Sequence, residues 1–187
     1  MLHNNYLPGF DETVMPHLDA AYNLARWLMR NEQDAQDCAQ EAFLRAVRFF
    51  PGFRGGDARA WLMRIVRNAC YTQMRANWPM RDAEDFDENA APPDSGAPNP
   101  EQALLKIDSG DLLRKALEEL PVSFREVVIL RELEGMSYKE IAQITGMPTG
   151  TVMSSLSRAR VRLRRVLTDL MSGNPLTDSR RVAVVGA

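Results

Sequence analysis

A stretch with few apolar residues divides the chain into two parts. Residues 79–101 read PMRDAEDFDENAAPPDSGAPNPE, and they are rich in proline, acidic and small residues. Such a composition cannot bury enough apolar surface to offset the conformational entropy that is lost on ordering. We therefore expect a flexible acidic linker at residues 79–100, so that each flanking segment builds a hydrophobic core of its own.

Helical periodicity dominates both flanking segments. Before the linker, breaks near residues 30–32 and 51–57 separate three predicted helices, at about 11–29, 32–50 and 58–77. After it, the periodicity returns at Glu101 and is broken near residues 120, 134 and 146. Alternating strand patterns are missing apart from a short RVAVV at the end. The sequence predicts an all-α protein with two small helical domains, at residues 10–78 and 101–171, and a tail at 172–187.

Several function classes receive little support from the composition. The two cysteines, Cys38 and Cys70, lack a CxxC or Cys/His cluster, so we expect buried thiols in a reducing compartment and no metal site. A signal peptide and a membrane span are not recognisable, which predicts a cytoplasmic protein without membrane insertion. Nucleophile, phosphate-loop and zinc-protease motifs are also missing, so we expect neither an enzyme nor a cofactor.

The charges are sorted along the chain, although the formal net charge is only −2. Residues 54–81 hold six arginines and one acid, and residues 137–165 hold six basic residues and one acid. The connecting residues 82–111 hold nine acids and one lysine. Two basic patches that flank an acidic strip indicate two contacts with a nucleic acid backbone.

The second basic patch follows the pattern of a helix-turn-helix. Ser137 and Glu140 have the spacing of a capping box, which begins a helix. Gly146 is suited to end that helix, Met147-Pro148 to form the turn, and Thr149 to cap the next helix. The second helix of such a unit can lie in the major groove of DNA. An ordinary amphipathic helix explains its apolar stripe equally well but does not explain the capped helix and turn before it.

The polar side of this second helix supplies candidate DNA contacts. Its N-terminal end exposes amides and hydroxyls that suit a phosphate, while small residues allow close approach to bases and arginines bind phosphates or guanine. The candidates are Thr149, Gly150, Thr151, Met153, Ser154, Ser155, Ser157, Arg158 and Arg160.

The predicted helix at 58–77 carries the first basic patch. Its polar side combines arginines, two aromatic residues and an amide, a combination that single-stranded nucleic acid recognition uses for phosphates, stacking and a base edge. These residues are Trp61, Arg64, Arg67, Asn68 and Tyr71. Half-buried packing for Trp61 and plain surface exposure for Asn68 are equally plausible from the pattern alone.

The predicted helix at 32–50 has an acidic side. Glu41 and Arg45 have the spacing of an i,i+4 ion pair, so the pattern by itself favours a solvated face over a docking surface.

Together these segments resemble a bacterial RNA polymerase sigma factor of the extracytoplasmic-function type. The resemblance rests on DAQDCAQEAFLRAVRFF, then FRGGDARAWLMRIVRNACY, then LPVSFREVVILRELEGMSYKEIAQITGMPTGTVMSSLSRARVRLRR, in the family's order. The length leaves room for only the two domains called sigma-two and sigma-four. The resemblance implies a transcription initiation factor whose partners are core RNA polymerase, promoter DNA and an anti-sigma factor.

The resemblance also implies roles for individual residues. Asn68 would help capture a flipped base of the minus-ten element, supported by its neighbours on the same helix side, and residues 138–157 would read the minus-thirty-five element. The polymerase-binding residues would be Asp34, Asp37, Gln40, Glu41 and Arg45. Many relatives carry Lys or Arg where this chain has Met153 and Ser155, which puts the promoter preference in doubt.

Two other function classes remain as alternatives. A free-standing helix-turn-helix regulator would bind duplex operators without polymerase, but the sequence shows no dimerisation or sensor segment, whereas such regulators usually read paired half-sites. A nucleic-acid-processing enzyme would need a metal or nucleophile constellation, and the sequence offers none.

Overall fold

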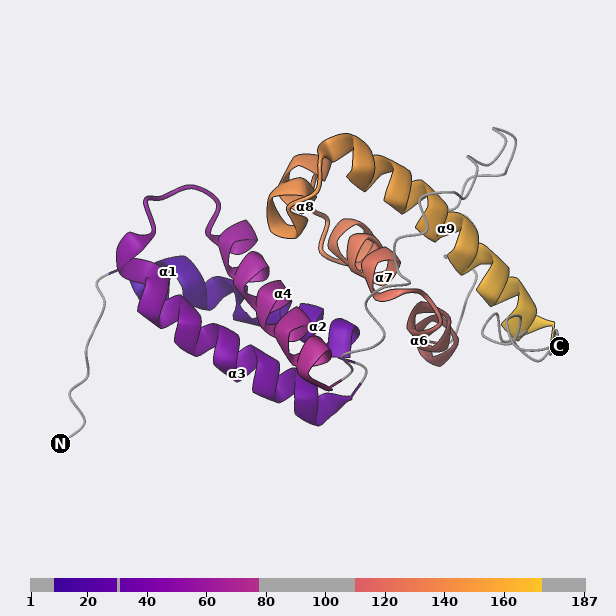
Figure 1. Ribbon diagram of the computed structural model, residues 1–187, viewed down its shortest axis with the longest axis horizontal. Helices are drawn as coiled ribbons and strands as arrows, with labels where there is room; N and C mark the ends of the chain where they lie inside the picture. Colours follow the sequence, from indigo (N-terminus) through magenta and orange to yellow (C-terminus); the bar gives the residue numbers. More distant parts are fainter. Residues whose placement is uncertain (1–8, 30, 78–109, 173–187) are drawn as a thin grey trace, which may run out of the picture.

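The computed structural model describes residues 9–29, 31–77 and 110–172, and within them it contains helices and turns but no strands. Residues 9–77 form the N-terminal block, shown in indigo to magenta in Figure 1, and residues 110–172 form the C-terminal block, shown in orange to yellow. The all-α prediction is confirmed for this part of the chain. The predicted linker at 79–100 and nearly all of the tail lie outside the described residues.

The first predicted helix is divided by a proline. The pattern predicted one helix at about 11–29, but the structure has α1 (Phe10–Val14), a 3-10 turn (Met15–His17) and α2 (Leu18–Met29). Pro16 stands at the beginning of the turn, where it lacks the amide hydrogen that a continuous α-helix would use. The apolar side still faces inward across the break, since Val14, Leu24 and Leu28 are buried.

The other two helices of the N-terminal block begin and end close to their predicted limits. Helix α3 covers Glu32–Phe49, and the Asn31 side chain caps it by accepting a hydrogen bond from the Asp34 amide at 2.7 Å. A 3-10 turn (Phe50–Gly52) and a glycine-containing loop lead to α4, Ala58–Asn77. Helices α2, α3 and α4 pack against one another around alanine, leucine and cysteine side chains, and Cys38 and Cys70 are free and buried, as predicted.

The C-terminal block contains α6 (Gly110–Glu118), α7 (Val122–Val128), a π-helical turn (Ile129–Leu133), α8 (Tyr138–Thr145) and α9 (Thr149–Met171). Arg125 on α7 is fully buried and donates hydrogen bonds to the carbonyls of Leu117, Glu118 and Leu120 at the end of α6. The carbonyls at the end of a helix lack the amide partner of a following turn, and Leu117 has in addition only the tighter bond from the Leu120 amide at 3.2 Å among the backbone bonds described, so Arg125 helps to satisfy these carbonyls and holds α6 against α7.

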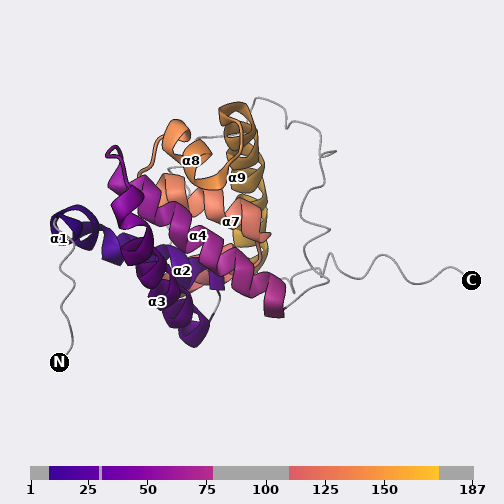
Figure 2. The same cartoon turned by 60° about the vertical axis from the view of Figure 1, so that its left-hand side comes forward.

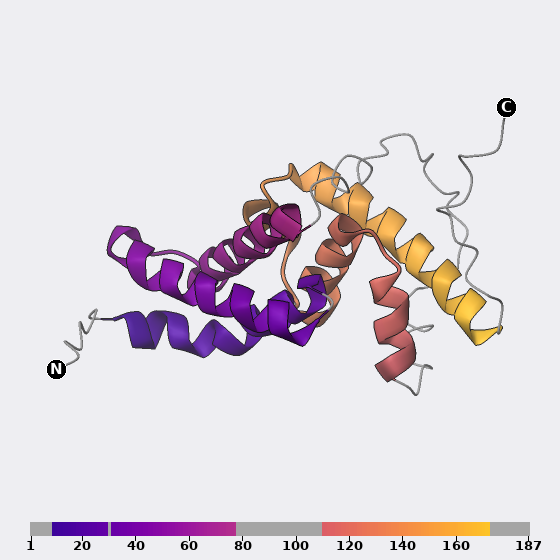
Figure 3. The same cartoon turned by 60° about the horizontal axis from the view of Figure 1, so that its bottom comes forward.

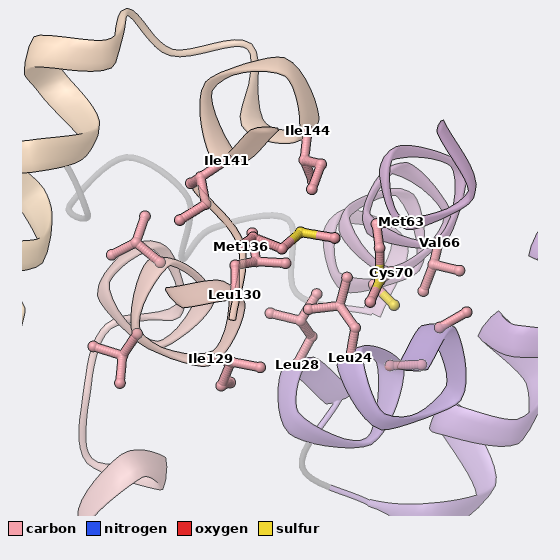
Figure 4. Packing of buried hydrophobic residues seen from close by; sticks show 14 of the residues in the cluster. Leu24, Leu28, Met63, Val66, Cys70, Ile129, Leu130, Met136, Ile141 and Ile144 are labelled. Atoms are coloured by element: carbon pink, nitrogen blue, oxygen red, sulfur yellow. The ribbon is translucent and has the colours of Figure 1, made fainter. Parts of the chain in front are cut away.

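The two blocks pack directly against each other. Helices α2 and α4 lie beside α7 and α8, while α9 covers the far side of the C-terminal block (Figures 2 and 3). Figure 4 shows Leu24, Leu28 and Met63 on one side of the boundary and Leu130 and Met136 on the other, within one hydrophobic cluster. The expectation of separate cores therefore needs correction, because each block completes its core with apolar side chains of the other.

Candidate nucleic-acid interface

The helix-turn-helix has the local geometry that its sequence predicted. The Ser137 hydroxyl accepts a hydrogen bond from the Glu140 amide at 3.3 Å, and the Glu140 carboxylate accepts one from the Ser137 amide at 2.7 Å. Hydrogen bonding of the Glu140 carboxylate to the side chain and the backbone amide of Ser137 lowers the pKa of Glu140 below its ordinary value. Gly146 ends α8 at φ 76°, a left-handed conformation that favours glycine. The predicted capping box and glycine stop are both present.

The beginning of α9 differs by one residue from the prediction. Pro148 precedes the helix with an extended backbone and its carbonyl accepts from the Val152 amide at 3.0 Å, so Thr149 is the first helical residue. Thr149 therefore does not cap the helix through its side chain. Thr149 and Gly150 are exposed, and Thr151 is half-buried, in the first turn, where helical amides have no intrahelical partner. This end of α9 keeps the electrostatic character that suits a phosphate.

The two sides of α9 separate as a helical wheel predicts, with one exception. Val152, Leu156, Ala159 and Leu163 are buried, whereas the exposed candidates beyond the first turn are Met153, Ser154 and Ser157. Ser155 is only 9 % exposed and lies on the buried side of the helix. Ser155 is therefore corrected from a candidate base contact to a packing residue.

The two candidate arginines of α9 have different surroundings. Arg158 is half-buried and lies along its own helix, 3.5 Å from the Ser154 hydroxyl. Arg160 instead pairs with Glu132 of the π-helical turn, at 2.5 Å. A surface ion pair of this kind is weak, so Arg160 can exchange Glu132 for a phosphate at little cost.

The polar side of α4 is divided between solvent and the C-terminal block. Arg64 and Asn68 are exposed. Arg67 donates from Nε to Oε1 of Glu126 at 2.6 Å, and the Tyr71 hydroxyl donates to Oε2 of the same carboxyl at 3.0 Å. The Arg67 guanidinium also lies over the Tyr71 ring, 4.2 Å from its centre. The structure thus brings Arg67 and Tyr71 together, as the pattern predicted, but on a carboxylate of the same chain.

Trp61 occupies a third environment on α4. It is half-buried, with its ring centre 5.1 Å from that of Phe53 and 6.4 Å from that of Phe50. Edge and tilted contacts of this kind are favourable between aromatic rings. Trp61 therefore packs against the turn that precedes α4, and part of its ring remains accessible.

Glu126 is the residue at this site that the sequence patterns did not single out. Its side chain is 1 % exposed, and burial raises the pKa of its carboxyl, although the Arg67 charge acts in the opposite direction. A second ion pair joins the blocks beside it, between Arg59 on α4 and Glu134, at 2.5 Å. The available signal was an acid inside the apolar run FREVVIL, which is unusual unless the acid has a buried partner.

The acidic side of α3 is largely open to solvent. Asp37, Gln40 and Glu41 are exposed, and the Arg45 Nε donates to Glu41 at 2.7 Å, the predicted i,i+4 pair. Asp34 is half-buried and accepts a hydrogen bond from the Gln73 side chain of α4 at 3.2 Å. Asp34 thus contacts a second helix, whereas the Glu41–Arg45 pair and the hydrogen bond from Gln33 to Asp37 stay within α3.

An exposed leucine accompanies these acids. Leu44 lies one turn after Glu41 and is 57 % exposed. A single exposed leucine is ordinary. Because it lies among the polar candidates, Leu44 is a further residue of this surface. Its position on the polar side of the helical wheel is the sequence feature that could have identified it.

The described residues contain no cluster of His, Cys, Asp and Glu that could hold a metal ion. Among them there is also no helix that is long and apolar enough to cross a membrane.

Two family models match the chain in sequence order. A model described as Sigma-70 region 2 matches residues 13–79, and one described as Sigma-70, region 4 matches residues 110–163. The two matches correspond to the N-terminal and C-terminal blocks.

Curated relatives extend the similarity over most of the chain. The RNA polymerase sigma-H factor of Pseudomonas aeruginosa is 34 % identical over 172 residues, which cover 87 % of this chain and 88 % of that protein. The ECF RNA polymerase sigma factor SigE of Mycolicibacterium smegmatis is 38 % identical over 162 residues, 86 % of this chain. That alignment covers 62 % of SigE, so this chain spans less than two thirds of the length of that relative.

Solved structures show the same arrangement of helices. The sigma factor RpoE from Bartonella quintana, in complex with the anti-sigma factor NepR, is similar with a TM-score of 0.66 and 32 % identity. That match covers 87 % of this chain and 98 % of the other. CnrH in complex with the cytosolic domain of CnrY has a TM-score of 0.59 and 25 % identity, with 88 % and 90 % of the two chains covered.

Proposed function

The chain belongs to the sigma-70 family of bacterial RNA polymerase sigma factors, within its extracytoplasmic-function group, and from this we propose that it binds core RNA polymerase and directs it to promoters. The observation that carries the proposal is the ordered match of both family regions along one chain, together with 34 % identity to a sigma factor of nearly the same extent. A sigma factor initiates transcription and makes or breaks no bond itself.

We assign the minus-ten element to the N-terminal domain, residues 10–78. Arg64 and Asn68 support this assignment, because a cation and an exposed amide on one helix side can hold a phosphate and a base edge. Extrusion of a base costs a few kcal/mol, which a pocket near Asn68 and the accessible part of the Trp61 ring would offset. Arg67 and Tyr71 join this surface once they are released from Glu126.

The minus-thirty-five element is assigned to the C-terminal domain, residues 101–171. The first turn of α9 offers amides and hydroxyls to a phosphate, while Met153, Ser154 and Ser157 present an apolar tip and two hydroxyls to base edges. Met153 is 52 % exposed, so it offers base edges an apolar contact, such as one with a thymine methyl group.

The acidic side of α3 is the proposed polymerase contact. Asp37, Gln40 and Glu41 are open to a basic or polar partner, Arg45 adds a cation at its edge, and Leu44 adds apolar area that becomes buried on docking. Asp34 contributes mainly by holding α3 to α4 through Gln73.

An anti-sigma factor is the third proposed partner. The RpoE and CnrH structures that this chain resembles are both complexes, the first with the anti-sigma factor NepR and the second with the cytosolic domain of CnrY. Because polymerase and chromosomal DNA are both in the bacterial cytoplasm, we place the function of this chain there.

The free-standing regulator is disfavoured by the match of residues 13–79 to Sigma-70 region 2, a segment that operator binding alone does not need. Run-off transcription with core RNA polymerase tests the choice. We expect transcription from a subset of genomic promoter fragments that core enzyme alone does not transcribe. If no fragment responds while the isolated chain binds duplex DNA tightly and specifically, the regulator is correct and the sigma assignment is wrong.

A further inference from the structure

The only two cysteines of the chain meet inside the N-terminal block. Cys38 lies on α3 and Cys70 on α4, and both thiols are free and buried where these helices pack together. Hydrogen bonding between the two thiols is the largest influence on the pKa of each, lowering the pKa of Cys38 and raising that of Cys70. The two sulfur atoms are therefore neighbours, although the cysteines are far apart in the sequence.

Small side chains line the side of α3 on which Cys38 lies. Ala35, Ala42 and Ala46 are fully buried there, at spacings that place them with Cys38 on one side of the helix. Because small side chains allow two helix axes to come close, short side chains from α3 and α4 can meet. A disulfide requires this closeness, since its two Cα atoms lie less than about 7 Å apart.

The Cys38 thiol is also connected to the acidic side of α3. Its Sγ donates a hydrogen bond to Oε1 of Gln73 at 3.3 Å, and Nε2 of Gln73 donates to Asp34 at 3.2 Å. Asp37 and Glu41 lie within one helical turn of Cys38 as well. Cys38 thus stands at the centre of the proposed polymerase contact, beneath its exposed side chains.

Cys70 has a corresponding place on α4. Arg67, Asn68 and Tyr71 of the proposed minus-ten surface all lie within one helical turn of Cys70. The cysteine pair therefore joins the helix that carries the proposed polymerase contact to the helix that carries the proposed minus-ten contact.

The two thiols differ in reactivity. The hydrogen bond from the Cys70 thiol favours the thiolate form of Cys38, and the thiolate is the nucleophilic form of cysteine. At Cys70, hydrogen bonding with Cys38, burial and the nearby charge of Glu126 all raise the pKa, so this thiol keeps its proton. Gln73, the hydrogen-bond partner of Cys38, is only half-buried, so movement of one flexible side chain opens a path from solvent to the Cys38 sulfur.

We propose that Cys38 and Cys70 are a redox pair, which hydrogen peroxide oxidises to a disulfide that joins α3 to α4 and weakens docking on the polymerase. The Cys38 thiolate attacks the O–O bond and becomes a sulfenic acid, and the other oxygen leaves as water with the proton that Cys38 released. The Cys70 sulfur then attacks the Cys38 sulfur, and the sulfenic oxygen leaves as water with the Cys70 proton. Two thiols and one peroxide thus give one disulfide and two waters, and a thiol reductant reverses the oxidation.

Oxidation changes the surroundings of Asp34 in two ways. It removes the hydrogen that Cys38 donates to Gln73, the residue that holds Asp34. It also brings the two sulfurs to about 2.05 Å, well inside the distance of hydrogen-bonded thiols, so α3 and α4 must shift against each other. The expected weaker docking rests on the proposed function, which places the polymerase contact on α3. A transient cytoplasmic disulfide of this kind is typical of redox sensing.

The experiment treats the full-length reduced chain with hydrogen peroxide, destroys the remaining peroxide with catalase, and alkylates free thiols with N-ethylmaleimide in denaturant. Mass spectrometry should show a monomer that has lost two hydrogens and carries no alkyl group, with the peptides of Cys38 and Cys70 joined. Dithiothreitol should restore two thiols that can be alkylated. In run-off transcription with untreated core polymerase, the oxidised chain should give less than half the transcript of the reduced chain, and dithiothreitol should restore it.

Two variants separate the disulfide from other effects of peroxide, such as methionine oxidation. Cys38→Ser keeps a donor for Gln73 but cannot form the bond, and Cys70→Ala places an alanine next to the buried Ala69 of the same helix. Either variant should transcribe as well after peroxide as before it. Circular dichroism confirms that each is folded, and if one is not, the other decides the question.

The proposal is overturned if peroxide leaves both thiols open to alkylation, or yields sulfinic acids or disulfides between two copies of the chain. It is also overturned if the oxidised chain transcribes like the reduced one, or if a folded cysteine variant loses transcription to peroxide equally. A reduced chain that supports no transcription at all rejects the sigma role instead, while the mass measurement still supports or rejects the redox pair.

Discussion

Arg67 on α4 and Glu126 on α7 form an ion pair, with 2.6 Å between Nε and Oε1, although 59 positions separate them in the sequence. Their side chains are 19 % and 1 % exposed, so the pair is largely removed from water. Unlike a surface pair, a buried pair is costly to break because the remaining partner keeps its desolvation penalty.

Arg67→Ala should therefore weaken the packing of the two blocks against each other more than loss of any exposed arginine does. Removal of one member of a buried ion pair costs roughly 3–5 kcal/mol, while loss of an exposed arginine costs well below about 1 kcal/mol. Arg64→Ala is the matched control, since Arg64 lies on the same helix and is exposed. Thermal unfolding and small-angle scattering measure the difference, and equal effects of the two substitutions would show that the pair contributes nothing to this packing.

The packing of the two blocks against each other (the closed state) should become more stable as the pH falls. Burial raises the pKa of Glu126 in the closed state, whereas after separation the exposed carboxyl has its ordinary value. Between these two values the closed state binds more protons, so its stability relative to the open state is greatest at low pH and is lost as pH rises through the raised pKa. The ionisable groups beside Glu126 are Arg67, Tyr71 and Cys70.

Small-angle scattering between pH 5 and pH 8 measures this dependence. Glu126→Gln, which cannot ionise, should remove the part of the pH dependence that arises at this site. A pH profile that is the same with Glu and with Gln at position 126 would assign the effect to other groups.

Asn68→Ala should reduce open-complex formation without loss of core polymerase binding. The side chain is exposed, so its removal leaves no cavity and unfolding should change by no more than about 0.5 kcal/mol. Permanganate footprinting of the melted promoter and a pull-down with core enzyme report the two activities separately. A parallel loss of both, or a lowered melting temperature, would identify Asn68 as a structural residue.

Met153→Ala should alter promoter preference at the minus-thirty-five element. Met153 is 52 % exposed near the beginning of α9, and a mismatch at one base pair that a protein reads costs roughly 1–3 kcal/mol, which is the upper bound for loss of this contact. Met171→Ala is the control, because Met171 is also exposed but lies at the other end of the same helix. Transcription from a library randomised in that element measures the preference, which should be unchanged if Met153 does not read a base.

The sequence alone determined the features that depend on neighbouring residues. The capping box of Ser137 and Glu140, the left-handed Gly146 and the limits of α3 and α4 followed from interactions within a few residues, and each is present in the structure. The break at Pro16 was also readable locally, but the apolar periodicity on both sides of it concealed it. The family followed from the order of the motifs.

Only the tertiary structure decided which polar residues remain available. Ser155 looked like a surface residue because serine is small and polar, yet packing against the core of the C-terminal block buries it. Arg67, Tyr71 and Glu126 belong to segments on opposite sides of the acidic stretch, and no local rule relates positions so far apart. Helix limits arise from hydrogen bonds over one turn, whereas the occupancy of a binding surface depends on which distant segment packs there.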